Sequence, residues 1–137
     1  MSQLGMGVML GMLAGNQRSV DTFTEAMNKT ITSLLLTEND ALRFEFDDGS
    51  KMELFDDGQY CCENRYMRTD DDLDYYVGSK LLSAETKEGP SEDDQWGEPH
   101  DVEFLEVETS KGVFTMASHN EHNGHYGGFS IRARAIA

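Results

Sequence analysis

The sequence has few of the residues that cross-link a fold. Its 137 residues include two cysteines, the adjacent Cys61 and Cys62. Adjacent cysteines do not easily bridge each other and leave no separate partner, so the sequence excludes a disulfide framework and indicates a reducing compartment. Apolar runs are also short. The segment Met1–Ala14 is interrupted by glycines and is shorter than the roughly 20 residues that a helix needs to span a bilayer. We therefore expect a cytoplasmic protein without a membrane anchor.

Basic residues are scarce as well. The chain has 11 Lys and Arg against 26 Asp and Glu, a formal net charge of -15. Such a charge repels nucleic acids and anionic membranes, so we expect neither as a partner. From residue 109 onward, however, Lys111, Arg132 and Arg134 stand against Glu121 alone, together with three of the four histidines. This mildly basic end of an acidic chain is the clearest indication of function in the composition.

Apolar and polar residues alternate along several short segments, as in half-buried strands. Asp48-Gly49 and Ser110-Lys111-Gly112 are typical of turns between antiparallel strands. We predict an α+β fold, mainly an antiparallel β-sheet of six or seven strands with one or two short helices. The predicted strands include residues 31–36, 42–47, 51–55, 80–85, 102–108 and 113–118, followed by a last strand.

The chain length suits one domain. Residues 1–28 are predicted to form an N-terminal segment and a docking helix, capped by Ser19 and ending near residue 28. Residues 29–137 are predicted to form a single antiparallel-sheet domain, with a second short helix ending near Gly78. Residues 86–101 hold both prolines and six acidic residues, which predicts a mobile acidic loop.

Residues 119–134 carry the candidate site, as a polar turn that leads into a strand. On that strand Ile131 and Ala133 point one way, while Arg132 and Arg134 point the other. Two like charges on one face require a partner, which is either a carboxylate of the acidic surface or a phosphate of a ligand. We predict that the arginines neutralise phosphates.

The turn supplies further candidate ligand contacts. His119, Asn120 and Asn123 would hydrogen-bond a base or ribose, and Tyr126 would stack on a base. The chain has no P-loop, no Rossmann fingerprint and no convincing pairing of a nucleophile with a base. The sequence therefore predicts ligand binding without catalysis and without a cofactor.

Two other functions stay open. The spacing His119-x-x-His122-x-x-His125 could hold a divalent metal of a nucleotide hydrolase, but the glycines nearby favour a turn, so no metal site is predicted. The net charge of -15 suits an acidic protein-binding inhibitor of a host defence enzyme. Cys61-Cys62 before Glu63 is more typical of buried strand residues than of a nucleophile.

Four short motifs carry a family resemblance. They are Tyr60-Cys61-Cys62-Glu63, Asp72-Leu73-Asp74-Tyr75-Tyr76-Val77-Gly78-Ser79, Leu82-Ser83-Ala84-Glu85 and Asn123-Gly124-His125-Tyr126. In this order, over about residues 30 to 134, they resemble a small phage and prophage protein family with Cys-Cys-Glu, Asp-Leu-x-x-Leu-Ile-Gly-Ser and Asn-Gly-Tyr-Tyr motifs. That family is associated with the phage anti-Thoeris sponge proteins of the first type.

The resemblance implies a phage anti-defence protein of the host cytoplasm. Such sponges sequester cyclic ADP-ribose isomers made by TIR-domain immune enzymes, and some also take cyclic oligonucleotides, without cleaving them and as homo-oligomers. It further implies sites near subunit contacts. The chain departs from the pattern at His125, where the family more often has an aromatic residue, and in its longer methionine-rich N-terminus.

Overall fold

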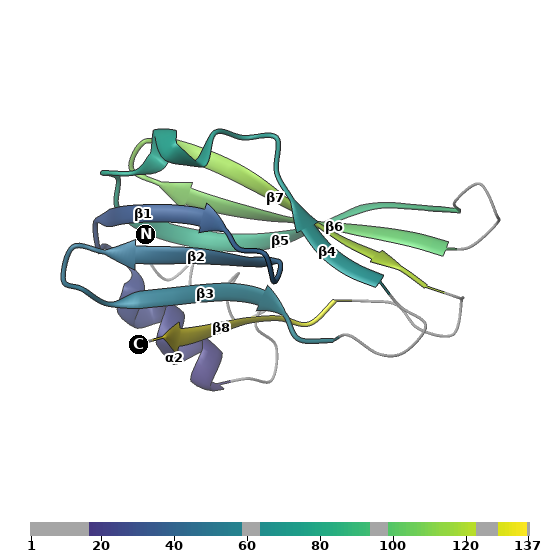
Figure 1. Ribbon diagram of the computed structural model, residues 1–137, viewed down its shortest axis with the longest axis horizontal. Helices are drawn as coiled ribbons and strands as arrows, with labels where there is room; N and C mark the ends of the chain where they lie inside the picture. The colour runs from purple at the N-terminus through teal and green to yellow at the C-terminus, as the bar shows by residue number, and fades with distance from the viewer. Residues whose placement is uncertain (1–16, 59–63, 94–98, 123–128, 137) are drawn as a thin grey trace.

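The computed structural model describes residues 17–58, 64–93, 99–122 and 129–136 (Figure 1). Eight strands, one α-helix and one 3-10 helix lie within these ranges, which confirms an α+β protein built mostly from antiparallel strands. The predicted number of strands, six or seven in one sheet, was too low, since the described residues form eight strands in two sheets. The elements are α2 (Gln17–Ala26), β1 (Ile31–Leu36), β2 (Ala41–Phe46), β3 (Lys51–Asp56), β4 (Asn64–Arg68), η1 (Leu73–Tyr76), β5 (Leu81–Asp93), β6 (Pro99–Thr109), β7 (Gly112–Glu121) and β8 (Ile131–Ile136).

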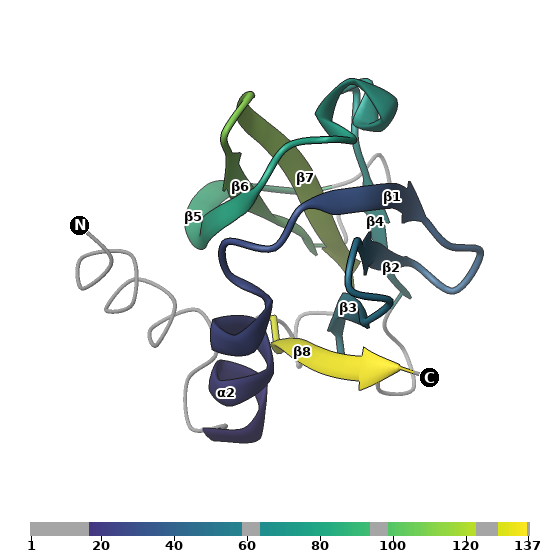
Figure 2. The same cartoon turned by 90° about the vertical axis from the view of Figure 1, so that its left-hand side faces the viewer.

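The strands form two four-stranded sheets, and every pairing in them is antiparallel. The first sheet has the order β1-β2-β3-β8, and the second has the order β4-β7-β6-β5. Figure 2 shows the two sheets as separate layers, with α2 beside β8. The chain therefore leaves the first sheet after β3 and returns to it only with β8. Local alternation of residues does not reveal such a return, which is why one sheet was predicted.

Side chains from both sheets and from α2 meet in one core. The first sheet contributes Phe44 and Leu54, the second contributes Leu105 and Phe114, and the helix contributes Phe23, and each is at most 1% exposed. Burying one such side chain stabilises a fold by roughly 1.5–3 kcal/mol. The two sheets and the helix thus share one hydrophobic core.

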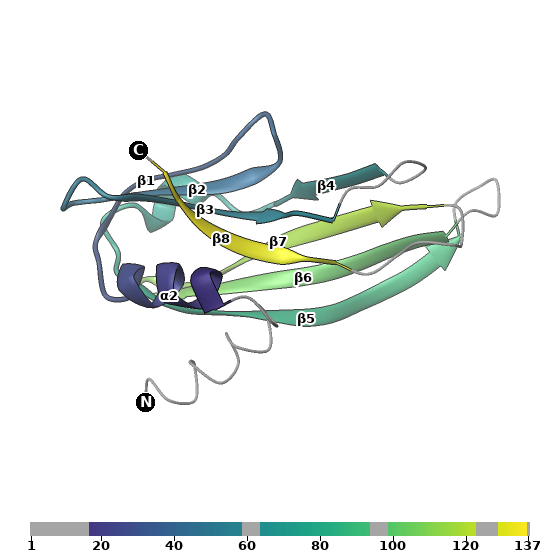
Figure 3. The same cartoon turned by 90° about the horizontal axis from the view of Figure 1, so that it is seen from below.

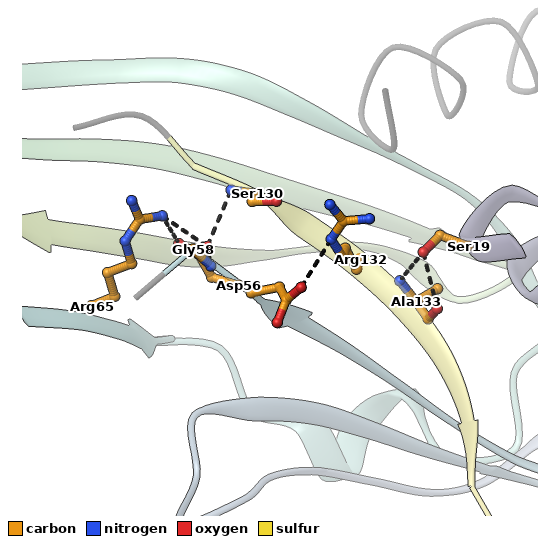
Figure 4. Close-up of polar contacts among 8 residues, drawn as sticks. Ser19, Asp56, Gly58, Arg65, Ser130, Arg132 and Ala133 are labelled. Carbon is orange, nitrogen blue, oxygen red and sulfur yellow. Dashed lines mark hydrogen bonds and ion pairs between the residues drawn. The ribbon is translucent and has the colours of Figure 1, made fainter. Parts of the chain in front are cut away.

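Helix α2 lies against β8, as Figure 3 shows from below. Its residues Val20, Phe23 and Ala26 share the buried stripe that the helical period requires. Ser19 lies within the helix rather than before it, so the prediction that Ser19 caps the helix was wrong. Its hydroxyl instead donates to the Ala133 carbonyl at 3.1 Å and accepts the Ala133 N–H at 3.2 Å (Figure 4).

The predicted acidic loop at residues 86–101 is mostly a hairpin. Strands β5 and β6 pair from Leu81 opposite Thr109 to Asp93 opposite Pro99, so the loop prediction was wrong for residues 86–93 and 99–101. The register shifts between Glu88 and Ser91. There a Cβ on Gly89 would lie 2.7 Å from the Val102 carbonyl oxygen, so glycine permits a close approach of two strands. Residues 94–98, including Trp96, lie outside the described ranges.

Strands β5, β6 and β7 run past the ends of β1, β2 and β3 (Figure 1). His119, Asn120 and Glu121 are the last residues of β7, so the predicted turn was wrong for these three residues. None of the helices within the described ranges is long and apolar enough to cross a membrane. The long second sheet therefore presents its own surfaces beyond the first.

Candidate functional site

The two arginines of β8 each lie beside a carboxylate. Arg134 donates from Nε and Nη2 to Glu53 Oε1 at 2.9 and 2.6 Å, while Arg43 Nε donates to Glu53 Oε2 at 2.9 Å. Glu53 is 4% exposed. Burial by itself raises the pKa of Glu53, but the hydrogen bonds from Arg134 and Arg43 outweigh burial and hold this pKa below its ordinary value. One buried carboxylate thus holds two guanidinium groups.

Arg132 lies 3.2 Å from Asp57, measured from Nε to Oδ2 (Figure 4). This contact is an ion pair without a hydrogen bond, since the buried Nε makes no hydrogen bond to any described residue. Arg134 also covers the Phe55 ring, with Cζ 4.1 Å from the ring centroid. Of the two partners that the sequence left open for these arginines, the acidic one is present. Their contact with a phosphate stays a prediction.

A cavity of about 560 Å³ lies elsewhere, on the face of β6 and β7 that points away from the core. Alternation along the two strands explains the division of side chains, since Leu105 and Phe114 face the core while Phe104 and Thr115 face the cavity. The cavity is lined by Arg68, Thr69, Asp70, Asp71, Val102, Phe104, Thr115, Ala117 and His119. It combines an apolar floor with charged and polar walls.

One wall is the chain that leaves β4. Strand β4 pairs with the end of β7 and stops at Arg68, opposite Ala117. Beyond it, side chains replace the strand ladder: Thr69 Oγ1 donates to the Thr115 carbonyl, and Asp71 Oδ2 accepts the Thr115 N–H, both at 2.7 Å. These bonds satisfy the edge of β7 and fix the wall beside the cavity.

His119 lies at one end of the cavity and is held by two rings. Its imidazole stacks on Tyr66, with centroids 4.7 Å apart and ring planes 7° apart. Its Nδ1 is 3.0 Å from His100 Nε2. Tyr66 is fixed in turn, because its hydroxyl donates to Glu121 Oε2 at 2.7 Å. Burial and this bond to Glu121 raise the pKa of Tyr66 to about 12.

The surroundings of His119 also set its charge. Desolvation lowers the pKa of His119 below its ordinary value, and the nearby His100 and Arg68 lower it further, against an opposing effect of Glu121. His119 is therefore neutral at pH 7. A neutral imidazole offers one N–H donor and one nitrogen acceptor.

Arg68 brings a permanent positive charge to the cavity. Its Nη1 is 2.8 Å from Asp40 Oδ1, and its side chain stays 62% exposed. The guanidinium also lies over Tyr66, with Cζ 4.9 Å from the ring centroid. A guanidinium that is this exposed keeps further N–H donors for a bound molecule.

The other predicted site residues lie apart from the cavity. Asn120 follows His119 on β7 but is fully buried, on the opposite side of the strand. Arg132 and Arg134 belong to the first sheet. Asn123 and Tyr126 lie outside the described residues. Of the predicted residues that the structure describes, His119 is the one that lies in the cavity wall.

The histidine spacing weighed as a metal site is divided by the fold. His119 bonds His100, whereas His122 Nε2 lies 2.8 Å from Asp101 Oδ2. Within the described ranges, no three His, Cys, Asp or Glu residues are grouped to hold a metal ion. His125, Cys61 and Cys62 lie outside those ranges.

Sequence reasoning missed Tyr66, His100 and Arg68. They come from β4 and β6, which flank β7, and only the register that places Tyr66 and Val102 opposite His119 brings them together. The one local indication was the alternation that places Tyr66 and Arg68 on the same side of a strand.

Comparison with known proteins gives one match. No curated protein and no solved structure matches the chain. A family model described as a domain of unknown function (DUF7448) matches residues 24–131. The matched span runs from inside α2 to the first residue of β8, so it includes every strand that lines the cavity.

Proposed function

The chain belongs to this family of domains of unknown function, and on that premise we propose that it binds and sequesters a small cyclic nucleotide without cleaving it. The cavity of about 560 Å³ on the second sheet carries this proposal. Small-molecule sites are typically concave, about 300–1,000 Å³ in size and mostly apolar, with a few polar groups that orient the ligand. The cavity has that size and that mixture of side chains.

The two ends of the cavity differ in chemistry. Arg68 and His119 offer N–H donors suited to phosphate oxygens. Thr115 and the carboxylate of Asp70 offer acceptors suited to ribose hydroxyls or base amino groups. Thr115 and His119 are four residues apart on β7, roughly 13 Å at the usual strand rise. A nucleotide carries its phosphate and its base at opposite ends, so it can contact both groups of side chains.

An apolar floor lies between these ends. Val102, Phe104 and Ala117 line the cavity side by side on β6 and β7. An inorganic anion gains nothing from contact with apolar side chains. A nucleobase can pack on them, because aromatic and apolar side chains stack readily on bases. The floor therefore favours a nucleotide over a simple anion.

The arrangement of the lining favours binding over turnover. His119 Nδ1 faces His100 rather than a hydroxyl or thiol. The Thr69 hydroxyl is engaged by the carbonyl of Thr115. Nucleophilic catalysis requires a base within hydrogen-bond reach of the nucleophile, and the described lining residues offer no such pair.

The wider role follows from the family resemblance of the sequence. It supports a phage anti-defence sponge that acts in the host cytoplasm on a cyclic ADP-ribose isomer or a cyclic oligonucleotide. A sponge acts by mass action, so it must hold its ligand tightly, and sub-micromolar binding requires more than about 8 kcal/mol. Homo-oligomerisation is part of the proposal, and β5, a 13-residue strand at the edge of the second sheet, suits contact with a second copy.

The test is calorimetry of the full chain with cyclic ADP-ribose isomers and with cyclic di- and trinucleotides. The bound ligand is then released by denaturation and analysed by chromatography. Intact ligand supports a sponge, and altered ligand indicates a hydrolase. No heat with any of these ligands contradicts the proposal and favours the acidic protein-binding inhibitor, to which the net charge of -15 is suited.

Substitutions locate the ligand. Arg68→Ala and His119→Ala remove the proposed phosphate donors and should each weaken binding. Arg18→Ala is the matched control, because Arg18 is an exposed arginine on α2 and not part of the cavity lining. If all three variants bind equally well, the ligand does not occupy this cavity.

A further inference from the structure

The contact between His100 and His119 joins two imidazoles end to end. The facing nitrogens are 3.0 Å apart, and the ring centroids are 5.1 Å apart. The centroid separation is close to the nitrogen contact plus the two ring radii, so the nitrogens point at each other. A contact of this length and direction is a hydrogen bond that holds one proton between two nitrogens.

Three protonation states of the pair have different consequences. In the neutral pair, one facing nitrogen donates and the other accepts. With one additional proton, one ring is an imidazolium and still donates to the neutral ring. With two additional protons, both facing nitrogens carry N–H groups, and the hydrogen bond is lost.

The other nitrogen of His119 is available to a ligand. His119 Nε2 has no hydrogen-bond partner among the described residues, and His119 lines the cavity. His100 does not line the cavity. When His100 Nε2–H donates to His119 Nδ1, the proton of His119 lies on Nε2, where it can bond an anion.

We propose that His100 is the positioning residue of His119, fixing the tautomer in which His119 Nε2–H donates to an anionic oxygen in the cavity. This inference deepens the proposed function and rests on it, because the anionic oxygen belongs to a phosphate of the bound nucleotide. Anion binding favours the pair with one additional proton, because that state adds a positive charge and keeps the hydrogen bond. Affinity for an anion should therefore rise as the pH falls from neutral to mildly acidic values.

Charged and titratable groups of several neighbouring elements surround the pair. On β5, Glu92 is opposite His100 in the strand pairing. On β4, Arg68 disfavours an additional proton and Tyr66 stays neutral. On β7, Glu121 favours the proton, and Asp70 and Asp71 contribute negative charge from the cavity wall. The lowered pKa of His119 agrees with a neutral His119 imidazole at pH 7 in the free protein, so an anion that favours the additional proton couples its binding to proton uptake.

The first test needs no nucleotide. Imidazole nitrogen NMR spectra of the full chain are recorded across pH with and without inorganic sulfate, whose charge is constant over this range. In the unsubstituted protein, sulfate should raise the pH at which the His119 signals respond to an additional proton. His122, which contacts Asp101 instead, is the internal control.

Two variants separate positioning from packing. His100→Gln keeps an amide that can bond His119 Nδ1 but does not titrate, so it should retain sulfate binding near pH 7.5 and lose its rise in mild acid. His100→Ala removes the bond and should weaken sulfate binding by about three- to tenfold, the effect of one hydrogen bond. Thermal melts establish that both variants are folded. An identical His119 titration and an identical sulfate affinity in all three proteins overturn the proposal.

The two proposals fail in different ways. If cyclic nucleotides give no heat while sulfate still shifts the His119 titration, the proposed function falls and the positioning role stands for anions in general. If nucleotides bind with the same affinity and pH profile in His100→Ala, the function stands and the positioning role falls.

Discussion

The two sheets treat their positive and ionisable groups in opposite ways. On the first sheet, Arg43 and Arg134 converge on Glu53, a carboxylate that the fold buries. On the second sheet, Arg68 stays 62% exposed beside the cavity, and His119 is bonded by another imidazole. On the first sheet the guanidinium N–H groups bond within the protein, whereas on the second sheet N–H groups stay available to a bound molecule.

This difference teaches that residue type alone does not identify a binding site. Arg132 and Arg134 stand out in the sequence because an acidic chain has few cations near its end. In the fold, both lie beside acidic side chains of or next to β3. Arg68 is less conspicuous in the sequence, but it lies at a cavity. Whether an arginine can bind a ligand therefore depends on its surroundings in the fold, which the sequence does not show.

The largest expected effect is on stability, from Glu53→Ala. Removing the buried carboxylate leaves Arg43 and Arg134 without their shared partner and should cost about 3 kcal/mol of unfolding free energy. Chemical denaturation measures this loss. Glu45→Ala, on the neighbouring strand, should change stability by less than about 0.5 kcal/mol. An equal loss in both variants would mean that the shared ion pair is not special.

The same substitution has a pH dependence. The pKa of Glu53 is lower in the folded protein than its ordinary value of 4.5, so its contribution to stability is present above that value and is lost as pH falls through the folded pKa. The stability difference between the unsubstituted protein and Glu53→Ala should therefore shrink below about pH 4.5.

Arg68→Ala tests the second sheet. Loss of a charge-assisted hydrogen bond to phosphate should weaken cyclic nucleotide binding by about 2 kcal/mol, roughly thirtyfold, as measured by calorimetry. The thermal melt should change little, because exposed ion pairs such as Arg68–Asp40 contribute only about 0–1 kcal/mol. A large loss of stability with unchanged binding would assign Arg68 to the fold instead.

The double substitution Arg132→Ala and Arg134→Ala could reverse the comparison. Because Arg134 bonds buried Glu53, we expect a loss of about 1.5 kcal/mol in stability and no loss of nucleotide binding in the second-sheet cavity. Calorimetry beside denaturant unfolding gives both quantities. Loss of binding in a folded protein would move the ligand to the first sheet, as the sequence predicts.

The smallest expected effect concerns Glu103, which lies on the side of β6 opposite the cavity. Burial raises the pKa of Glu103, and the negative charges of Asp56 and Glu88 raise it further. The ionised form is thus disfavoured by folding, so Glu103→Gln should stabilise the protein at pH 7, within the about 0.5 kcal/mol that is usual for substitutions outside the core. The gain should vanish below about pH 4.5, where the carboxyl is neutral in both states.

Glu106→Gln is the matched control for that gain. Glu106 is on the same strand but contacts Lys87 at 3.0 Å, and this contact raises the pKa of Lys87. Its substitution should give no stabilisation. If both variants are stabilised equally, the effect reflects overall negative charge rather than the surroundings of Glu103.

The sequence predicts the first three strands well because their residues alternate cleanly. Leu42, Phe44 and Phe46 are buried in β2, while Arg43 and Glu45 between them are not. Such alternation is sufficient to indicate strands and hairpins. It does not indicate which sheet a strand joins, because that depends on contacts between residues far apart in the chain.

The long hairpin was harder to predict. The run of acidic residues with Gly89 and Pro99 is typical of loops, yet β6 has strand partners on both sides, and glycine fits where β5 approaches it closely. Pairing between strands overrides local preference in such cases. The same reason explains why His119 and Asn120, typical turn residues, extend β7.

Of the residues discussed at the candidate site, the sequence predicted one, His119. His119 was singled out from the sequence, but Tyr66 and His100 reach it only because β4 and β6 flank β7. No spacing in the sequence encodes that lateral order. The stacked and hydrogen-bonded rings are therefore a product of tertiary register.

The bond between Ser19 and Ala133 fastens together two segments 114 residues apart in the chain. Because one hydroxyl occupies both the outward amide and the outward carbonyl of Ala133, an incoming strand finds neither group free at that point of β8. Ser19 thus blocks strand pairing at Ala133, in the middle of the outer edge of β8. Both residues fall outside the span that the family model matches, so this protection of the β8 edge is not part of the matched domain.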